Sequence, residues 1–176
     1  MVRAVALALG ALVVFPTFAS AHGPTRQKVT ETVEINAPAD KVWAVIGNFQ
    51  DMSWHPAVAK TEGSGGNDAN ATRTLTLTSG GTIEEKLISN DPAKKVYKYE
   101  IVKVDPKVLP VNNYSSNLSV KGEGDKSTVE WKGAFYRGFM NNDPPPELSD
   151  EAAKKAVTDV YRGGLDALKK KLESGG

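Results

Sequence analysis

Cysteine is missing from this sequence of 176 residues, and histidine occurs only twice. Without cysteine the chain can form neither a disulfide nor a thiolate metal site, and it has no thiol nucleophile. A phosphate-binding loop is also missing, because the glycine-rich run Gly63–Gly66 lacks the following lysine. No serine lies in a nucleophile-elbow pattern. We therefore predict no cofactor and no metal, and we assign no catalytic residue from these motifs.

An excess of charge of one sign is missing too. The chain has 22 basic and 21 acidic residues, which gives a formal net charge of +1. Nucleic-acid-binding domains usually carry a strong basic excess, so nucleic acid is not a predicted partner. The apolar run Ala4–Val14 is too short to cross a bilayer, which takes about 20 residues.

The N-terminal segment has the features of a secretory signal peptide. Arg3 supplies a positive charge before the apolar run, and Pro16 breaks that run. Ala19-Ser20-Ala21 then offers the small residues that a signal peptidase requires. We predict a signal peptide at residues 1–21, export to the periplasm, and no membrane span after cleavage.

Cleavage after Ala21 would make His22 the first residue of the working protein. A terminal amine and an imidazole together can chelate copper. A copper site would also need His55, the only other histidine, and no third ligand stands out. Copper binding is therefore a minor hypothesis beside the prediction of no metal.

Alternating β-branched and apolar residues predict a sheet that occupies most of the chain. The connections between successive segments are short and rich in glycine, proline, asparagine and aspartate, which implies antiparallel neighbours. The expected strands are Gln27–Ile35, Val58–Glu62, Thr72–Thr78, Thr82–Ser89, Lys95–Lys103, Asn113–Lys121 and Ser127–Tyr136.

Helical spacing of apolar residues predicts a short helix at 40–46 and one long helix over Ser149–Leu172. We expect a second short helix at 49–55, between the first helix and the next strand. Ser149 is suited to cap the long helix. Gly163-Gly164 inside it weakens helix propensity but would let another group approach the backbone closely.

A sheet with one apolar face must be covered, and the C-terminal helix is the only predicted element long enough to cover it. We therefore predict a single α+β domain over residues 22–176. It has a curved antiparallel sheet of about six to seven strands wrapped around the long helix, with a cavity between sheet and helix.

Arg73 and Glu85 are the most informative polar pair. Side chains alternate along a strand, so each lies on the apolar face of its strand. A three-residue loop, Ser79-Gly80-Gly81, would make them inward-facing diagonal neighbours. An inward carboxylate and guanidinium must be paired or hydrated. They form either a structural ion pair that closes the cavity or a polar anchor or general acid–base group within it.

Apolar and aromatic side chains on the inward faces are the expected lining of the cavity. They serve equally well as ordinary core packing. These residues are Leu75, Leu77, Ile83, Tyr97, Tyr99, Tyr114, Trp131 and Phe135.

Two segments are candidates for the cavity mouth or for partner contact. Trp54 and His55 precede a proline, and His55 is either a donor at the mouth or a hydrogen-bonded surface histidine. Phe139 and Met140 lie in a loop that continues into Pro144-Pro145-Pro146. Stiff proline-rich segments often serve in recognition, and the alternative interpretation is an ordered connection to the last helix.

The order of elements, the segment from Val33 to Trp43 and the segment Tyr161–Leu165 resemble the START-like, helix-grip superfamily with its SRPBCC and polyketide cyclase/dehydrase members. Three further segments resemble the MxaD-type periplasmic proteins: Trp54–Val58, Arg73–Leu77 and Gly80–Glu85. That resemblance implies an accessory role in methanol oxidation, beside methanol dehydrogenase and its cytochrome c acceptor.

Three functional hypotheses follow. The first is a non-catalytic periplasmic accessory protein of the MxaD type that contacts methanol dehydrogenase or cytochrome c. The second is a carrier of a small hydrophobic ligand. The third is a cyclase- or dehydratase-like enzyme that uses Glu85 with Arg73. Fold alone does not choose among them.

Overall fold

The structure, a computed structural model, describes residues 23–174. The predicted signal peptide and His22 lie outside the described residues. Seven strands form one antiparallel sheet in the order β1-β7-β6-β5-β4-β3-β2. The strands are β1 (Gln27–Ile35), β2 (Val58–Ser64), β3 (Thr72–Leu77), β4 (Thr82–Asp91), β5 (Val96–Val104), β6 (Val111–Glu123) and β7 (Lys126–Arg137).

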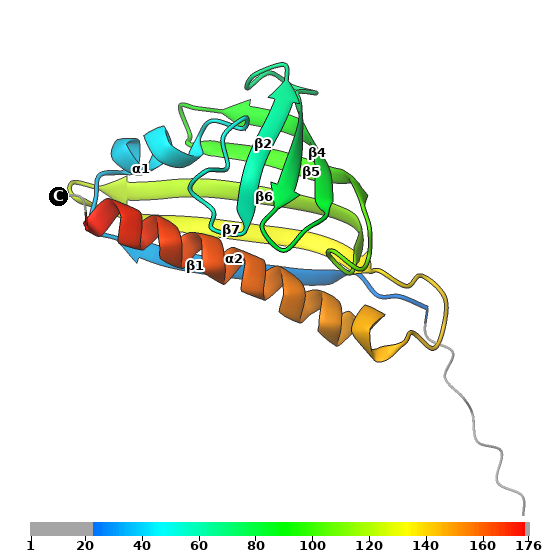
Figure 1. Cartoon of the computed structure of the whole chain (residues 1–176). Helices are drawn as coiled ribbons and strands as arrows, with labels where there is room; N and C mark the ends of the chain where they lie inside the picture. Colours follow the sequence, from blue (N-terminus) through cyan, green and yellow to red (C-terminus); the bar gives the residue numbers. More distant parts are fainter. Residues whose placement is uncertain (1–22, 175–176) are drawn as a thin grey trace, which may run out of the picture.

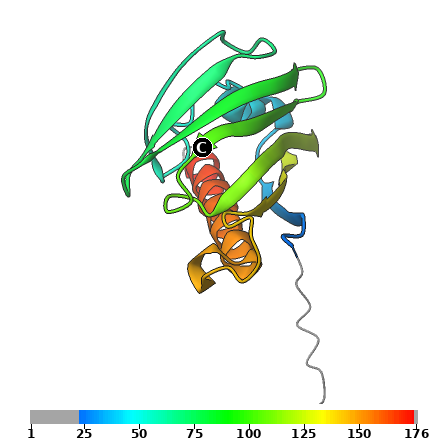
Figure 2. The ribbon, with the colours of Figure 1, turned by 90° about the vertical axis from the view of Figure 1, so that its right-hand side faces the viewer.

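One long helix, α2 (Asp150–Glu173), runs along β1 and β7 on the concave side of the sheet (Figure 1). Figure 2 shows the other strands arching above this helix. A short helix, α1 (Ala39–Ile46), follows β1, and a 3-10 turn, η1 (Pro146–Leu148), precedes α2. The predicted sheet wrapped around a C-terminal helix is confirmed.

Helix α2 begins and ends as its sequence predicts. The Ser149 side chain accepts a hydrogen bond from the backbone N–H of Ala152 at 3.1 Å, which satisfies one of the free N–H groups of the first turn. Acidic Asp150 and Glu151 lie at the positive end of the helix dipole. The stripe that faces the sheet is buried at Ala153, Val157, Tyr161, Gly164, Leu165, Leu168 and Leu172. No helix within residues 23–174 is long and apolar enough to span a bilayer.

The prediction of a second short helix over residues 49–55 is wrong. This segment is a series of turns, because side chains bind the backbone groups that a helix would use. Asn67 Oδ1 accepts from the Phe49 N–H at 2.7 Å, and Asp51 Oδ1 accepts from the Ser53 N–H at 2.8 Å. The turns bring Met52 and His55 over the concave face of the sheet.

The β3–β4 connection is longer than predicted. The last pair of the ladder is Thr76 with Thr82, so residues 77–81 separate the paired positions. The Leu77 N–H donates to the Gly81 carbonyl, and Gly80 and Gly81 adopt positive φ angles of 91° and 85°. The pairing therefore differs by two residues from the predicted one. A shift of two preserves which side chains face inward, so the inward placement of Arg73 and Glu85 is correct.

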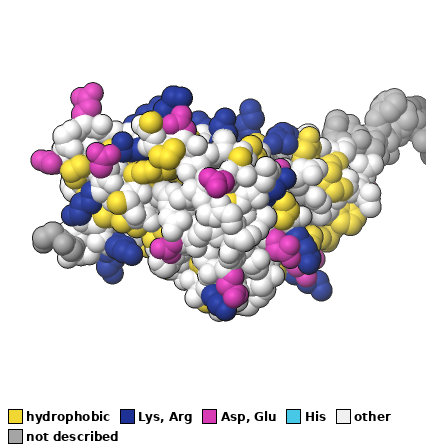
Figure 3. Space-filling model, turned by 90° about the horizontal axis from the view of Figure 1, so that it is seen from above, with side chains coloured by type: hydrophobic (Ala, Val, Ile, Leu, Met, Phe, Trp, Pro, Cys, Tyr) yellow, Lys and Arg dark blue, Asp and Glu magenta, His cyan; other side chains and the backbone are white. Residues whose placement is uncertain are grey.

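The charged surface is mixed. Figure 3 shows one face on which acidic and basic side chains are interspersed with small groups of apolar ones. Three large apolar side chains are exposed among the described residues, namely Ile88, Val102 and Met140. Met140, in the loop before η1, is 41% exposed.

Gly164 allows α2 to approach the turn that precedes β2. A Cβ atom on Gly164 would lie 2.4 Å from His55 Cδ2 and 3.0 Å from Trp131 Cζ3. The neighbouring Gly163 has no atom within 4 Å of the same position. The close approach that Gly163-Gly164 suggested is therefore present, and Gly164 alone is responsible for it.

These two glycines give a matched test of helix packing. Gly164→Ala forces the His55 ring or the helix to move, and we expect it to lower the free energy of unfolding by about 1–3 kcal/mol. Gly163→Ala should raise stability by up to about 1 kcal/mol, because alanine favours the helix. Urea unfolding of both variants measures the difference. Equal effects would contradict the assigned contact.

Candidate functional site

Arg73 and Glu85 form a buried ion pair under the concave face of the sheet. They lie directly opposite each other on β3 and β4, and Arg73 Nε donates to Glu85 Oε2 at 2.6 Å. Arg73 Nη1 donates to the Phe49 carbonyl at 2.7 Å, and the guanidinium lies 4.1 Å from the centre of the Phe49 ring. The predicted ion pair is present, and it ties the turns after α1 to two strands.

The two charges stay buried because each is the partner of the other. Removing an isolated charge from water costs several kcal/mol, so neither group could remain here alone. Burial raises the pKa of the Glu85 carboxyl, and the Arg73 guanidinium opposes that rise. The second carboxylate oxygen of Glu85, Oε1, makes no hydrogen bond with the described residues.

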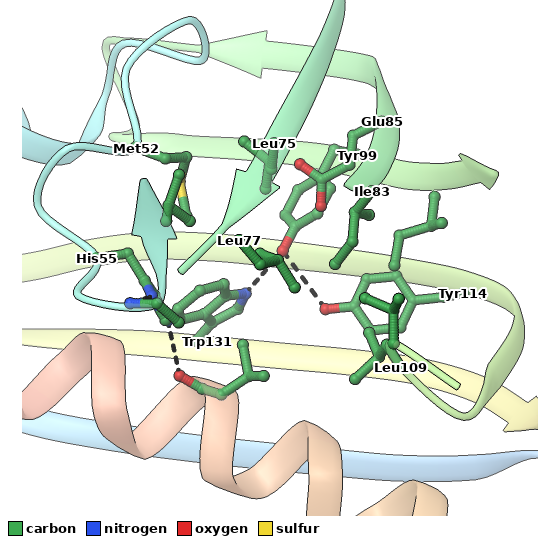
Figure 4. A pocket seen from close by; sticks show the side chains of 15 residues that line it. Met52, His55, Leu75, Leu77, Ile83, Glu85, Tyr99, Leu109, Tyr114 and Trp131 are labelled. Atoms are coloured by element: carbon green, nitrogen blue, oxygen red, sulfur yellow. Dashed lines mark hydrogen bonds between the residues drawn. The ribbon is translucent and has the colours of Figure 1, made fainter. Parts of the chain in front are cut away.

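A cavity of about 70 Å³ lies between the concave face of the sheet, the turns before β2 and helix α2 (Figure 4). Its walls are mostly apolar. Eight predicted residues line it: His55, Leu75, Leu77, Ile83, Glu85, Tyr99, Tyr114 and Trp131. Arg73, Tyr97 and Phe135 are buried but do not line the cavity, so their predicted places there are wrong.

Seven lining residues were not predicted: Met52, Ala57, Val58, Ile101, Val108, Leu109 and Val160. Val108 and Leu109 close one side of the cavity, from the turn between β5 and β6. Val108 and Leu109 lie between Pro106 and Pro110, in a turn. Turns are usually polar, so two neighbouring apolar residues there were a sequence signal that the turn packs inward. Gly81 admits this turn, since a Cβ there would lie 2.4 Å from Val108 Cγ2.

A chain of hydroxyl groups leads from the cavity wall, at Tyr99 and Tyr114, into the core beneath it. Ser116 Oγ lies 3.0 Å from Tyr161 Oη, which lies 2.5 Å from Tyr114 Oη, which in turn lies 3.4 Å from Tyr99 Oη. Trp131 Nε1 donates to Tyr99 Oη at 3.1 Å and to Ser116 Oγ at 3.0 Å.

Burial raises the pKa of Tyr99, Tyr114 and Tyr161 above that of a free phenol, so all three hydroxyl groups stay protonated. The Trp131 ring stacks on Tyr161, with 4.4 Å between ring centres and 13° between planes. Aromatic packing thus holds this chain of donors and acceptors in place.

His55 is buried, which contradicts its interpretation as a surface histidine. Its side chain is at the cavity wall, and Nε2 donates to the Val160 carbonyl at 2.9 Å while Nδ1 accepts from the Ala57 N–H at 3.1 Å. This pattern requires a neutral ring. Desolvation lowers the pKa of His55, and the bond to Val160 opposes that change.

The other predicted contact residues fall in two places. Trp54 is buried against Trp131, with ring centres 5.7 Å apart, so it is not at the mouth of the cavity. Its Nε1 has no hydrogen-bond partner among residues 23–174. Phe139 and Met140 lie away from the cavity, in a loop that Arg137 holds by donating to the Phe139 carbonyl at 2.8 Å.

No group of three or more His, Cys, Asp or Glu side chains in the described part of the chain is placed to hold a metal ion. Both ring nitrogens of His55 are already engaged. A copper site with His22 would have to break one of these bonds. The arrangement offers instead one hydrogen-bonding corner, formed by Tyr99 and Glu85, in an otherwise apolar space.

The fold, with its cavity between sheet and helix, defines the class as the helix-grip, SRPBCC type. The chain belongs to the family described as polyketide cyclase / dehydrase and lipid transport, whose model matches residues 26–173. Among curated proteins no match is found.

Solved structures agree with this assignment. The protein XoxI from Bacillus cereus is 31% identical, with 83% of this chain and 95% of that chain covered and a TM-score of 0.70. A protein from Nitrosospira multiformis is 26% identical, with 85% and 100% covered and a TM-score of 0.69. Norcoclaurine synthase from Thalictrum flavum, solved with dopamine and hydroxybenzaldehyde, is 16% identical, with 96% and 99% covered and a TM-score of 0.65. This last likeness concerns the fold alone.

The ion pair predicts an asymmetric response to substitution. Glu85→Gln leaves the Arg73 charge buried without a counter-charge, so we expect it to lower the free energy of unfolding by about 3–5 kcal/mol. The double variant Arg73→Met/Glu85→Leu removes both charges and should lose less. Urea unfolding compares the two. A loss below about 1 kcal/mol for Glu85→Gln would contradict this account.

His55 predicts a pH dependence of stability. Its pKa is lower in the folded protein than the usual 6.5, so the unfolded chain binds more protons as pH falls through that value. Stability should therefore be full above about pH 6.5 and decrease toward pH 5. His55→Asn should decrease less steeply over the same range, measured by urea unfolding at each pH. Parallel curves for both proteins would rule out this role.

Proposed function

We propose that this protein is a non-catalytic accessory protein of the MxaD type, exported to the periplasm. In this role it supports methanol oxidation by contacting methanol dehydrogenase or its cytochrome acceptor. The observation that carries the proposal is the nearly filled interior. The cavity measures about 70 Å³, whereas pockets for small organic molecules usually measure about 300–1,000 Å³. A protein with so little interior space acts most readily through its surface.

The segments that resemble MxaD-type proteins support the proposal because they are neighbours in space. Arg73–Thr76 pairs with Thr82–Glu85, and Val58 pairs with Leu77. Trp54 and His55 lie in the turn that leads to Val58. The resemblance therefore describes one region of the molecule, centred on the ion pair and the cavity.

The state of the ionisable groups also favours a non-catalytic role. Glu85 is held by Arg73, and His55 is held as a neutral ring by two backbone groups. A general base must reach a substrate proton at hydrogen-bond distance. In the enzyme hypothesis, Glu85 would have to do this from a cavity that admits only a few heavy atoms.

A second candidate function, the carrier of a small hydrophobic ligand, is favoured by the apolar walls of the cavity. Leu75, Leu77, Ile83 and Val108 face this space together. Its volume limits the cargo to a very small molecule unless the walls move apart.

Capture from a periplasmic extract of the native host, grown on methanol, tests the accessory role. We expect the tagged protein to enrich methanol dehydrogenase or its cytochrome. Met140→Asp places a charge on the exposed loop before η1 and should reduce that enrichment roughly fivefold, as expected for a contact residue worth about 1 kcal/mol.

Val102→Asp is the matched control, because Val102 is 52% exposed but lies on β5. It should leave the enrichment unchanged. If neither the dehydrogenase nor the cytochrome is enriched by the unaltered protein, the accessory role fails. Equal enrichment by the Met140→Asp and unaltered proteins would remove this loop from the interface.

A further inference from the structure

The donor and the acceptor of each hydrogen bond in the hydroxyl chain can be assigned one after another, starting from Ser116. Ser116 Oγ lies 3.0 Å from the Lys132 carbonyl, which can only accept. If Ser116 donates to that carbonyl, Tyr161 must donate to Ser116, and Tyr114 must donate to Tyr161. The Tyr99 proton is then left with Tyr114 Oη at 3.4 Å as its only acceptor in the chain.

The opposite direction leads to the same end. If Ser116 donates to Tyr161, then Tyr161 donates to Tyr114 and Tyr114 donates toward Tyr99. Tyr99 Oη also accepts from Trp131 Nε1, so its own proton again has no good acceptor in the chain. A distance of 3.4 Å is beyond the usual O–H···O range of 2.5–3.0 Å.

Tyr99 therefore carries the spare donor of the chain, and its side chain lines the cavity (Figure 4). A buried donor without a good acceptor is costly, and a molecule that supplies an oxygen atom would satisfy it. We propose that the cavity binds a small, neutral carbonyl compound whose oxygen accepts a hydrogen bond from Tyr99. This inference rests on the second candidate function, the carrier.

The size and charge of the cavity define the class of ligand. An apolar cavity of about 150 Å³ holds the six heavy atoms of benzene. By proportion the 70 Å³ here admits a molecule of about three heavy atoms, and about four when they fill the space closely. Burial penalises any charged ligand, and Glu85 at the wall would repel an anion. Arg73, which could offset an anion, does not line the cavity.

Acetone and 2-methylpropene are matched probes for this proposal. They have the same four-atom heavy skeleton, and only acetone carries an oxygen. Titration of the purified protein with each, followed by the NMR shifts of the Leu75 and Ile83 methyl groups, gives both affinities. We expect saturable shifts with both probes.

Tyr99→Phe keeps the ring and removes the donor. It should weaken acetone binding roughly three- to tenfold, the range of one net hydrogen bond, and change 2-methylpropene binding less than twofold. Tyr97→Phe is the control, because it removes a buried hydroxyl from the same strand outside the cavity. It should change neither affinity.

The outcomes separate the two claims. If both probes bind and Tyr99→Phe leaves acetone binding unchanged, the assignment of Tyr99 as donor is overturned while the carrier function survives. If neither probe gives saturable shifts at these methyl groups, the carrier function fails and the proposed ligand fails with it. A loss of affinity for both probes in Tyr99→Phe also overturns the proposal, because the ring rather than the hydroxyl group would then be responsible.

Discussion

Arg73 and Glu85 meet under a sheet that would otherwise be lined by apolar and aromatic side chains. Because a buried guanidinium cannot remain without a counter-charge, the contact between them fixes how β3 and β4 face the interior. The same guanidinium binds the Phe49 carbonyl, so the turns after α1 are drawn to the pair. Those turns carry Met52 and His55, which form one wall of the cavity. The closed shape of the interior thus depends on one ion pair.

A second junction closes the interior from the side of the helix. His55 binds the Val160 carbonyl, and its ring fits against α2 because Gly164 has no side chain. Trp131 fills the space beside it and stacks on Tyr161. With both junctions made, little volume is left between sheet and helix. That geometry favours binding over the conversion of a large substrate. The protein would bind either a partner at its surface or a very small molecule in its interior.

The sequence predicted the features that depend on periodicity. Alternation placed Arg73, Glu85 and Tyr99 on the inward face, and helical spacing predicted the long helix whose apolar stripe packs against the sheet. These predictions survived an error in the hairpin, because a shift of two residues does not exchange the faces. The five-residue connection could not be foreseen, since it depends on contacts from elsewhere, such as Val108 packing on Gly81.

The features that were wrong or missed depend on distant partners. His55 looked like a surface residue because its neighbours in sequence are a proline and a turn, while its actual partners are Val160 and Gly164 on α2. The segment from Phe49 to His55 was predicted to be a short helix, but Asn67 binds its first N–H and turns it away from a helix. Arg73 lies behind the cavity wall, since Phe49 and Glu85 use its polar atoms.

Native mass spectrometry of the purified protein tests whether the interior has room only for a very small molecule. We expect the mass of the polypeptide alone. A molecule of about four heavy atoms gains at most about 1.5 kcal/mol of binding free energy per heavy atom, which is too little to keep it bound when the protein enters the gas phase. A retained organic ligand of about ten or more heavy atoms would contradict this small interior, because such a ligand is far larger than the cavity. Such a ligand would show that the walls at Glu85 and His55 open to admit a larger substrate or cargo.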